Sequence, residues 1–107
     1  MNYSPKYFKE LQKRYPAVTG CFDELERICA KAGPLDKKTQ HLIKLGIAIG
    51  ISSEGDVQNI TAQALKNGAT PDEIRHAVLL SVTTAGFPAM IVAMQSAEEI
   101  IATRPKK

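Results

Sequence analysis

The sequence predicts an all-α protein, because helix start and stop signals recur along the chain while no long segment alternates apolar and polar residues at the two-residue period of a strand. With 107 residues, 44% of them apolar and 23% charged, the chain has the length of one domain and the composition of a folded protein. We therefore expect one domain over residues 1–107, with an N-terminal helix in residues 1–16 and a helical core in residues 17–102.

Prolines and cap residues bound the first three helices, which we expect at about residues 4–15, 17–32 and 36–51. Ser4 before Pro5 opens the first helix, since a cap residue followed by proline is a common helix start. Pro16 separates the first helix from the second, and Gly33-Pro34 ends the second. Asp36 is the expected N-cap of the third.

The last three helices are expected at about residues 53–67, 70–84 and 88–103. Ser53 and Asp56 have the spacing of a capping box at the start of the fourth helix. Thr70 and Glu73 repeat this spacing at the start of the fifth, with a proline between them. Gly86-Phe87-Pro88 breaks the chain before the sixth helix.

Two of these helices are very apolar for a lone small bundle. The third is apolar around most of its circumference from Leu42 to Ile51, and Gly46 and Gly50 leave a smooth strip where another helix backbone could come close. The fifth presents apolar residues on two faces. Because such helices must be covered nearly all round, we expect a homo-oligomer, although the other four helices could also wrap these two.

The net charge of +3 and the isoelectric point near 9.0 come from the chain ends, residues 1–16 and 103–107, and the middle is mildly acidic. A nucleic-acid-binding module would carry a basic stripe along one element with stacking aromatics, so we expect no nucleic-acid partner. The longest apolar stretch, residues 42–51, is far shorter than a membrane span, and the N-terminus lacks the apolar core of a signal peptide. We expect a cytoplasmic protein without a membrane partner.

The two cysteines, Cys21 and Cys29, lie eight residues apart on the second expected helix. At a rise of 1.5 Å per residue their Cα atoms are about 12 Å apart, and a disulfide needs them within about 7 Å. We therefore expect two buried structural thiols. Two cysteines without Cys-x-x-Cys spacing give no zinc signature, and we expect neither a metal nor a cofactor.

Three strings together make the sequence resemble the carboxymuconolactone decarboxylase family, which includes the alkylhydroperoxidase-D-like proteins. They are Leu35-Asp36-Lys37-Lys38-Thr39 with the apolar helix after it, Ala64-Leu65-Lys66-Asn67-Gly68-Ala69-Thr70-Pro71-Asp72-Glu73-Ile74, and Gly86-Phe87-Pro88-Ala89. The resemblance covers about residues 17–102. It implies an all-helical subunit that assembles into a homo-oligomeric ring, commonly a trimer or a hexamer.

The peroxidase branch of this family, a relative of the peroxiredoxins in activity, has a Cys-x-x-Cys pair, a His one turn later and a Glu on the preceding helix. A thiolate at a helix N-terminus has the lowered pKa that attack on a peroxide needs. The corresponding positions of this sequence hold Ser53, Asp56, Ile60 and His41. The resemblance therefore implies that thiol peroxidase activity by this route is absent.

The decarboxylase that names the family uses no cysteine. A lactone decarboxylase must hold a carboxylate, stabilise an enolate and return a proton, which calls for a cation and an acid–base group in a small apolar pocket. His41 is the first catalytic candidate, with Lys44 one turn later as a carboxylate clamp. His76 beside Arg75 is a second such pair. We expect the pocket between the third, fourth and fifth helices.

Each candidate also has a structural interpretation. Lys44 and Arg75 suit solvated faces, and His76 suits packing or an interface. Ser53 and Asp56, at positions where a substrate could be bound, suit helix capping. Two functions remain open: a cofactor-independent lyase acting on a small carboxylated or lactone metabolite, and a non-catalytic oligomeric binding or accessory protein.

Overall fold

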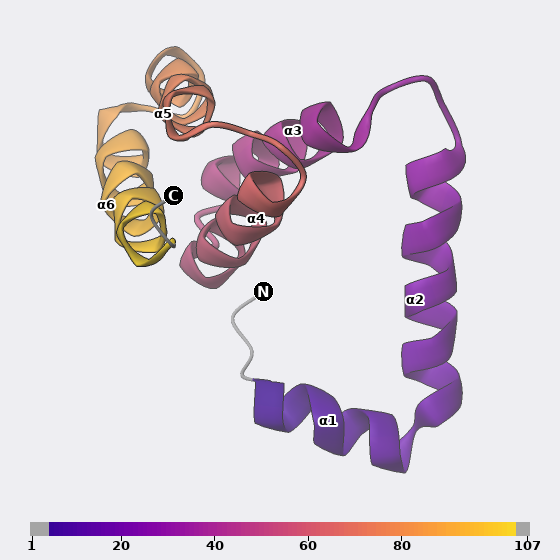
Figure 1. Ribbon diagram of the computed structural model, residues 1–107. Coiled ribbons are helices and arrows are strands. Elements are labelled where there is room, and N and C mark those ends of the chain that lie inside the picture. The colour runs from indigo at the N-terminus through magenta and orange to yellow at the C-terminus, as the bar shows by residue number, and fades with distance from the viewer. Residues whose placement is uncertain (1–4, 105–107) are drawn as a thin grey trace. The chain divides into compact units, whose positions relative to one another are not determined.

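The computed structural model describes residues 5–104, and every regular element in this range is a helix (Figure 1). The elements are α1 (Pro5–Arg14), α2 (Pro16–Lys31), α3 (Lys37–Gly50), α4 (Glu54–Lys66), α5 (Pro71–Leu80), the 3₁₀-helix η1 (Ser81–Thr83) and α6 (Phe87–Thr103). The all-α prediction is confirmed, with each helix within a few residues of its expected bounds. Ser4, the expected first cap, lies outside the described residues.

The chain divides into two compact units between Leu35 and Asp36. We call the unit that holds α1 and α2 the arm, and the unit that holds α3 to α6 the core unit. Within residues 5–104, no helix is both long enough and apolar enough to cross a membrane.

The arm has almost no interior. Pro16 begins α2, and Figure 1 shows α1 and α2 extending from this bend as the two sides of an L. In α2 the only buried residue is Thr19. The large apolar side chains of α2 are between 44% and 59% exposed; they are Val18, Phe22, Leu25 and Ile28.

Cys21 and Cys29 lie on α2 as exposed, free thiols. The expected burial of both cysteines is therefore wrong. The cysteines do lie on the apolar face of α2, as the periodicity predicts. They are exposed because nothing within the arm covers that face.

The core unit contains one contiguous apolar core to which α3, α4, α5 and α6 all contribute. The helix α4 packs against α3 and α6, and α5 packs against α3 and α6. Leu45 of α3, with Ile74 and Val78 of α5, is fully enclosed. On α6 the buried face carries Ala93 and Ala97, and such small residues let neighbouring helices approach closely.

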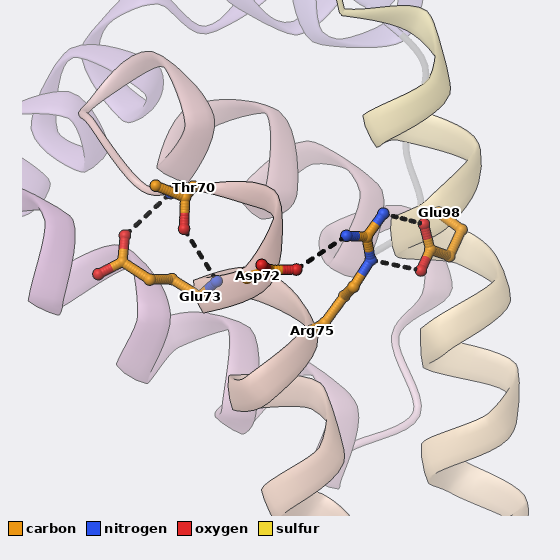
Figure 2. Close-up of polar contacts among 5 residues, drawn as sticks. All are labelled: Thr70, Asp72, Glu73, Arg75 and Glu98. Carbon is orange, nitrogen blue, oxygen red and sulfur yellow. Dashed lines mark hydrogen bonds and ion pairs between the residues drawn. The ribbon is translucent and has the colours of Figure 1, made fainter.

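Local hydrogen bonds fix two of the helix starts as predicted. The Asp36 carboxylate accepts from the Thr39 amide at 2.8 Å, and hydrogen bonds from Thr39 lower the pKa of Asp36. At α5, the Glu73 amide donates to Thr70 Oγ1 at 3.1 Å and the Thr70 amide donates to Glu73 Oε1 at 2.9 Å (Figure 2). Both halves of the second predicted capping box are therefore present.

Gly68 ends the helix before α5, and a 3₁₀ turn follows the end of α5. Gly68 follows α4 with φ +97°, a left-handed conformation that suits glycine at a helix C-terminus. The expected fifth helix to residue 84 ends as an α-helix at Leu80 and continues as η1. A 3₁₀ turn at a helix end is common, because it satisfies the last carbonyl groups with shorter-range bonds.

Thr61 of α4 carries a buried hydroxyl, Oγ1, that lacks a hydrogen-bond partner among the described residues. Such an unpaired group costs about 1–3 kcal/mol. We expect Thr61→Val, which keeps the shape and removes the hydroxyl, to raise the free energy of unfolding by about 1 kcal/mol, measured by urea denaturation. Thr61→Ala, which leaves a cavity, should lower it. A Thr61→Val variant no more stable than wild type would mean that the hydroxyl is satisfied in solution.

Candidate functional site

A groove of about 440 Å³ lies in the core unit between the start of α4 and the side of α6, and we call it the α4–α6 groove. Its size is at the lower end of the range for small-molecule sites. It is lined by Ile49, Ser52, Ser53, Glu54, Val57, Ala85, Pro88, Ala89, Val92, Ala93 and Ser96. The walls are therefore mostly apolar, with three hydroxyl groups and one carboxylate.

The chain reaches this groove through a strained turn between α3 and α4. Ser52 has φ +58°, and it is the one non-glycine residue with positive φ in the described range. For a residue with a Cβ this conformation costs about 1–2 kcal/mol. The Ser53 amide donates to the Ala48 carbonyl at 3.0 Å, which closes the turn. The groove consequently opens on the first turn of α4, the partially positive end of that helix.

The predicted capping box at the start of α4 does not form. Ser53 is the N-cap residue, but its side chain makes no capping hydrogen bond. Its hydroxyl instead donates to Asp56 Oδ2 at 2.8 Å. A hydroxyl can donate to a carboxylate and still accept from an amide, so this bond does not by itself prevent capping. The cause that fits is the backbone: the ψ of Ser53, 88°, differs from the extended conformation usual for an N-cap.

Ser96 supplies the most informative polar group of the groove. It lies on α6 and is 6% exposed, and it lines the groove. Among the described residues, Thr61 Oγ1 is the enclosed side-chain polar atom that lacks a partner, so the Ser96 hydroxyl is not a buried group left unpaired. A hydroxyl in the wall of a groove can donate a hydrogen bond to a ligand oxygen.

A second groove of about 490 Å³, which we call the α3–α5 groove, lies on another side of the core unit. It is lined by Thr39, Leu42, Ile43, Gly46, Glu73, His76, Ala77, Leu80, Ser81 and Thr84. Glu73 is held here by the Thr70 amide and by Lys38 Nζ at 3.1 Å, and these two partners lower its pKa. Most of the remaining lining is apolar.

The sequence-predicted site residues do not gather in one place. His41 is half-buried and Lys44 is exposed on α3, and neither lines either of the two grooves. His76 is exposed and lines the α3–α5 groove. Ser53 lines the α4–α6 groove. Asp56 does not line it, but its carboxylate accepts the hydrogen bond from the Ser53 hydroxyl.

Arg75 is engaged in ion pairs that tie α5 to α6. Its Nε and Nη2 donate to the two oxygens of Glu98 at 2.7 and 3.0 Å, and its Nη1 donates to Asp72 at 3.0 Å (Figure 2). The bidentate pair with Glu98 raises the pKa of Arg75 and lowers that of Glu98. With five donors in a planar fork, Arg75 is placed to hold two helices together.

The sequence did not predict that Ser52, Glu54 and Ser96 line the α4–α6 groove. We expected a pocket between the third, fourth and fifth helices, whereas the walls of this groove come mainly from α4 and α6. One signal was available for Ser96. It lies three residues after Ala93 and next to Ala97, on a helix face that is otherwise apolar and buried. A polar residue on such a face needs a hydrogen-bond partner or contact with solvent, and here it lies in the wall of the groove.

Comparisons with known proteins identify a family and two similar proteins. The sequence profile of the carboxymuconolactone decarboxylase family matches residues 16–99. An uncharacterised protein of Methanocaldococcus jannaschii is 29% identical over 93 residues, which is 86% of this chain and 89% of that protein. The crystal structure of an apo carboxymuconolactone decarboxylase family protein from Legionella pneumophila superposes with a TM-score of 0.81 at 25% identity, covering 91% of this chain and 87% of that one.

Proposed function

Because the chain belongs to the carboxymuconolactone decarboxylase family, we propose that it binds a small, largely apolar, oxygen-bearing metabolite, a lactone or a carboxylated ring, in the α4–α6 groove. The observation that supports this proposal is the position of Ser96 in the wall of a mostly apolar groove. A lactone carbonyl would accept a hydrogen bond from this hydroxyl.

The rest of the groove suits the same class of ligand. Ile49, Val57 and Val92 offer an apolar surface for a ring. The first turn of α4 carries the partial positive charge of a helix N-terminus, which favours a carboxylate or a carbonyl oxygen. Ligand pockets commonly combine apolar walls with a few polar groups that fix orientation, and the α4–α6 groove has this composition.

Binding without turnover is the function that one chain supports best. Among the groove-lining residues Glu54 is the only ionisable side chain, so the cation that a decarboxylase needs would have to come from the helix end alone. Lyase activity is the second candidate. In that reaction the bond to the carboxylate breaks, CO₂ leaves, the electron pair remains as an enolate, and Glu54 relays a proton from water to the enolate carbon.

The binding proposal predicts that native mass spectrometry with a panel of small lactones and carboxylates detects a one-to-one complex. Ser96→Ala should weaken this complex by about three- to tenfold, the value of one hydrogen bond. Ser81→Ala is the matched control, since Ser81 is equally buried at 6% exposure but lines the α3–α5 groove. Equal affinities of the Ser96 variant and wild type would contradict the proposal.

The same ligands separate binding from lyase activity. If the protein is a lyase, CO₂ release should be detectable and Glu54→Gln should abolish it while the complex persists in the mass spectrum. CO₂ release that survives in Glu54→Gln would exclude Glu54 as the proton donor.

A further inference from the structure

Val57 lies on the closed side of the α4–α6 groove. It lines the groove and is nevertheless 2% exposed. Two other lining residues, Ile49 and Ala93, are nearly buried as well, at 2% and 4%. Val92 of α6, by contrast, is 43% exposed and belongs to the open rim. A ligand that enters past Val92 therefore ends against Val57.

The helices α4 and α6 come together just past this closed side. Gln58, the neighbour of Val57, lies close to Glu99 of α6, with 3.5 Å between Nε2 and Oε1. Glu99 is three residues, about one turn, after the groove-lining Ser96. Ala97 of α6 is 0% exposed. The groove consequently stops at Val57 because the two helices pack together there.

An unpaired hydroxyl lies one helical turn beyond Val57. Thr61 follows Val57 by four residues on α4, so the two side chains lie on the same side of the helix, about 6 Å apart along its axis. Thr61 is 0% exposed, and its Oγ1 lacks a hydrogen-bond partner among the described residues. Side chains on an α-helix lean toward its N-terminus. Thr61 therefore leans toward the turn that Val57 occupies.

Apolar residues flank Thr61 along α4. Val57 lies one turn before it, Ala64 lies about one turn after it, and both belong to the apolar core. Thr61 itself does not line the α4–α6 groove. An enclosed hydroxyl between apolar turns is costly unless an acceptor or a water reaches it. The groove is a route by which one would reach it, and the Val57 side chain stands on that route.

We propose that Val57 determines which ligands the α4–α6 groove accepts, because it separates the groove from the Thr61 hydroxyl. The ligand part of this inference rests on the proposed function, but the separation can be measured without a ligand. With valine here, a ring whose carboxylate lies at the first turn of α4 has to end in an apolar group. A polar substituent at the far end would face the Val57 methyl groups and lose its hydrogen bonds to water.

Alanine at position 57 would change this specificity. It lacks the two γ methyl groups of valine, so the groove would extend to Thr61. The Thr61 hydroxyl would then donate to water or to a ligand oxygen. Benzoate and 4-hydroxybenzoate are a matched pair of probes, since they differ only in a hydroxyl group opposite the carboxylate.

A double-variant cycle tests the separation without a ligand. Thr61→Val should raise the midpoint of urea denaturation of the wild-type protein, because it removes the unpaired hydroxyl. In the Val57→Ala background the same change should no longer raise the midpoint, since water from the groove then reaches the hydroxyl. Val92→Ala is the matched control. It removes the same atoms from the open rim, and Thr61→Val should keep its full effect there.

Native mass spectrometry tests the effect on ligands. Wild type should bind benzoate more tightly than 4-hydroxybenzoate. Val57→Ala should shift this preference toward 4-hydroxybenzoate by about three- to tenfold, the value of one hydrogen bond. The shift should be absent from the Val57→Ala/Thr61→Val double variant and from Val92→Ala.

The other outcomes have distinct meanings. If Thr61→Val raises the midpoint equally with valine and with alanine at position 57, or has no effect in wild type, the inference is overturned. A preference shift that persists in the double variant overturns it as well. If Val57→Ala does not fold by circular dichroism, Thr61→Val alone decides: an unchanged preference between the two benzoates supports the separation, and a changed preference contradicts it. A wild type that binds none of the carboxylates and lactones contradicts the proposed function, while the denaturation cycle still decides whether Val57 shields Thr61.

Discussion

Leu45→Ala should lower the free energy of unfolding by about 3–5 kcal/mol, the cost of a cavity left by a leucine in a packed core. Leu45 is 0% exposed and belongs to the contiguous core of the core unit. In a chain of this size such a loss is a large part of the total stability. The measurement is urea denaturation followed by circular dichroism.

The matched control is Leu79→Ala, which removes the same atoms from a side chain that is 51% exposed on α5. We expect a change of about 1 kcal/mol or less, since little apolar area leaves a packed environment. Both variants are compared at one protein concentration, because self-association would make the apparent stability depend on concentration. Equal losses for the two leucines would contradict the burial that distinguishes them.

The sequence predicted most of the fold because the relevant signals are local. Asp36 and Thr70 bind amides three residues away in their own chain, so their capping role depends on little else. Gly68 can end α4 because glycine tolerates a positive φ, a property that does not depend on neighbouring residues. Such signals set helix bounds before any tertiary contact is known.

The failures concern features that depend on partners distant in sequence or on an unusual turn. Periodicity places Cys21 and Cys29 on the apolar face of α2, but it does not reveal whether anything covers that face. The spacing of Ser53 and Asp56 fits a capping box, yet the turn through Ser52 leaves the Ser53 hydroxyl directed to the carboxylate. Spacing alone cannot distinguish these two hydrogen bonds.

The residues that line the α4–α6 groove were mostly not predicted, for the same physical reason. The family resemblance points to His41 and Ser53, because it matches positions along this sequence to the reactive positions of the peroxidase branch. Which residues line a groove depends instead on how α4 packs against α6. This packing places Ser53 and Ser96, which are 43 residues apart in the sequence, in the lining of the same groove. Family membership alone does not tell which side chains this particular packing exposes.

Gly86→Ala should lower the free energy of unfolding by about 2 kcal/mol, although there is room for the methyl group. Gly86 precedes α6 with φ +104° and ψ 159°, a region that is essentially restricted to glycine and costs other residues about 1–3 kcal/mol. The added Cβ would meet only Pro88 Cδ, at an ordinary contact distance of 3.9 Å. The expected loss therefore comes from backbone conformation and not from a clash.

Gly46→Ala separates this conformational cost from the effect of adding a methyl group. Gly46 lies inside α3 with open space around its would-be Cβ, so alanine should raise the free energy of unfolding by about 0.5–1 kcal/mol through its better helix propensity. Both glycine variants are measured by urea denaturation at one protein concentration, because self-association would make the apparent stability depend on concentration. If Gly86→Ala were as stable as its parent, the turn before α6 would have to relax to a negative φ. That relaxation would shift Pro88 and Ala89 in the wall of the α4–α6 groove, so the stability of this variant also tests whether the turn at Gly86 holds the shape of the proposed binding site.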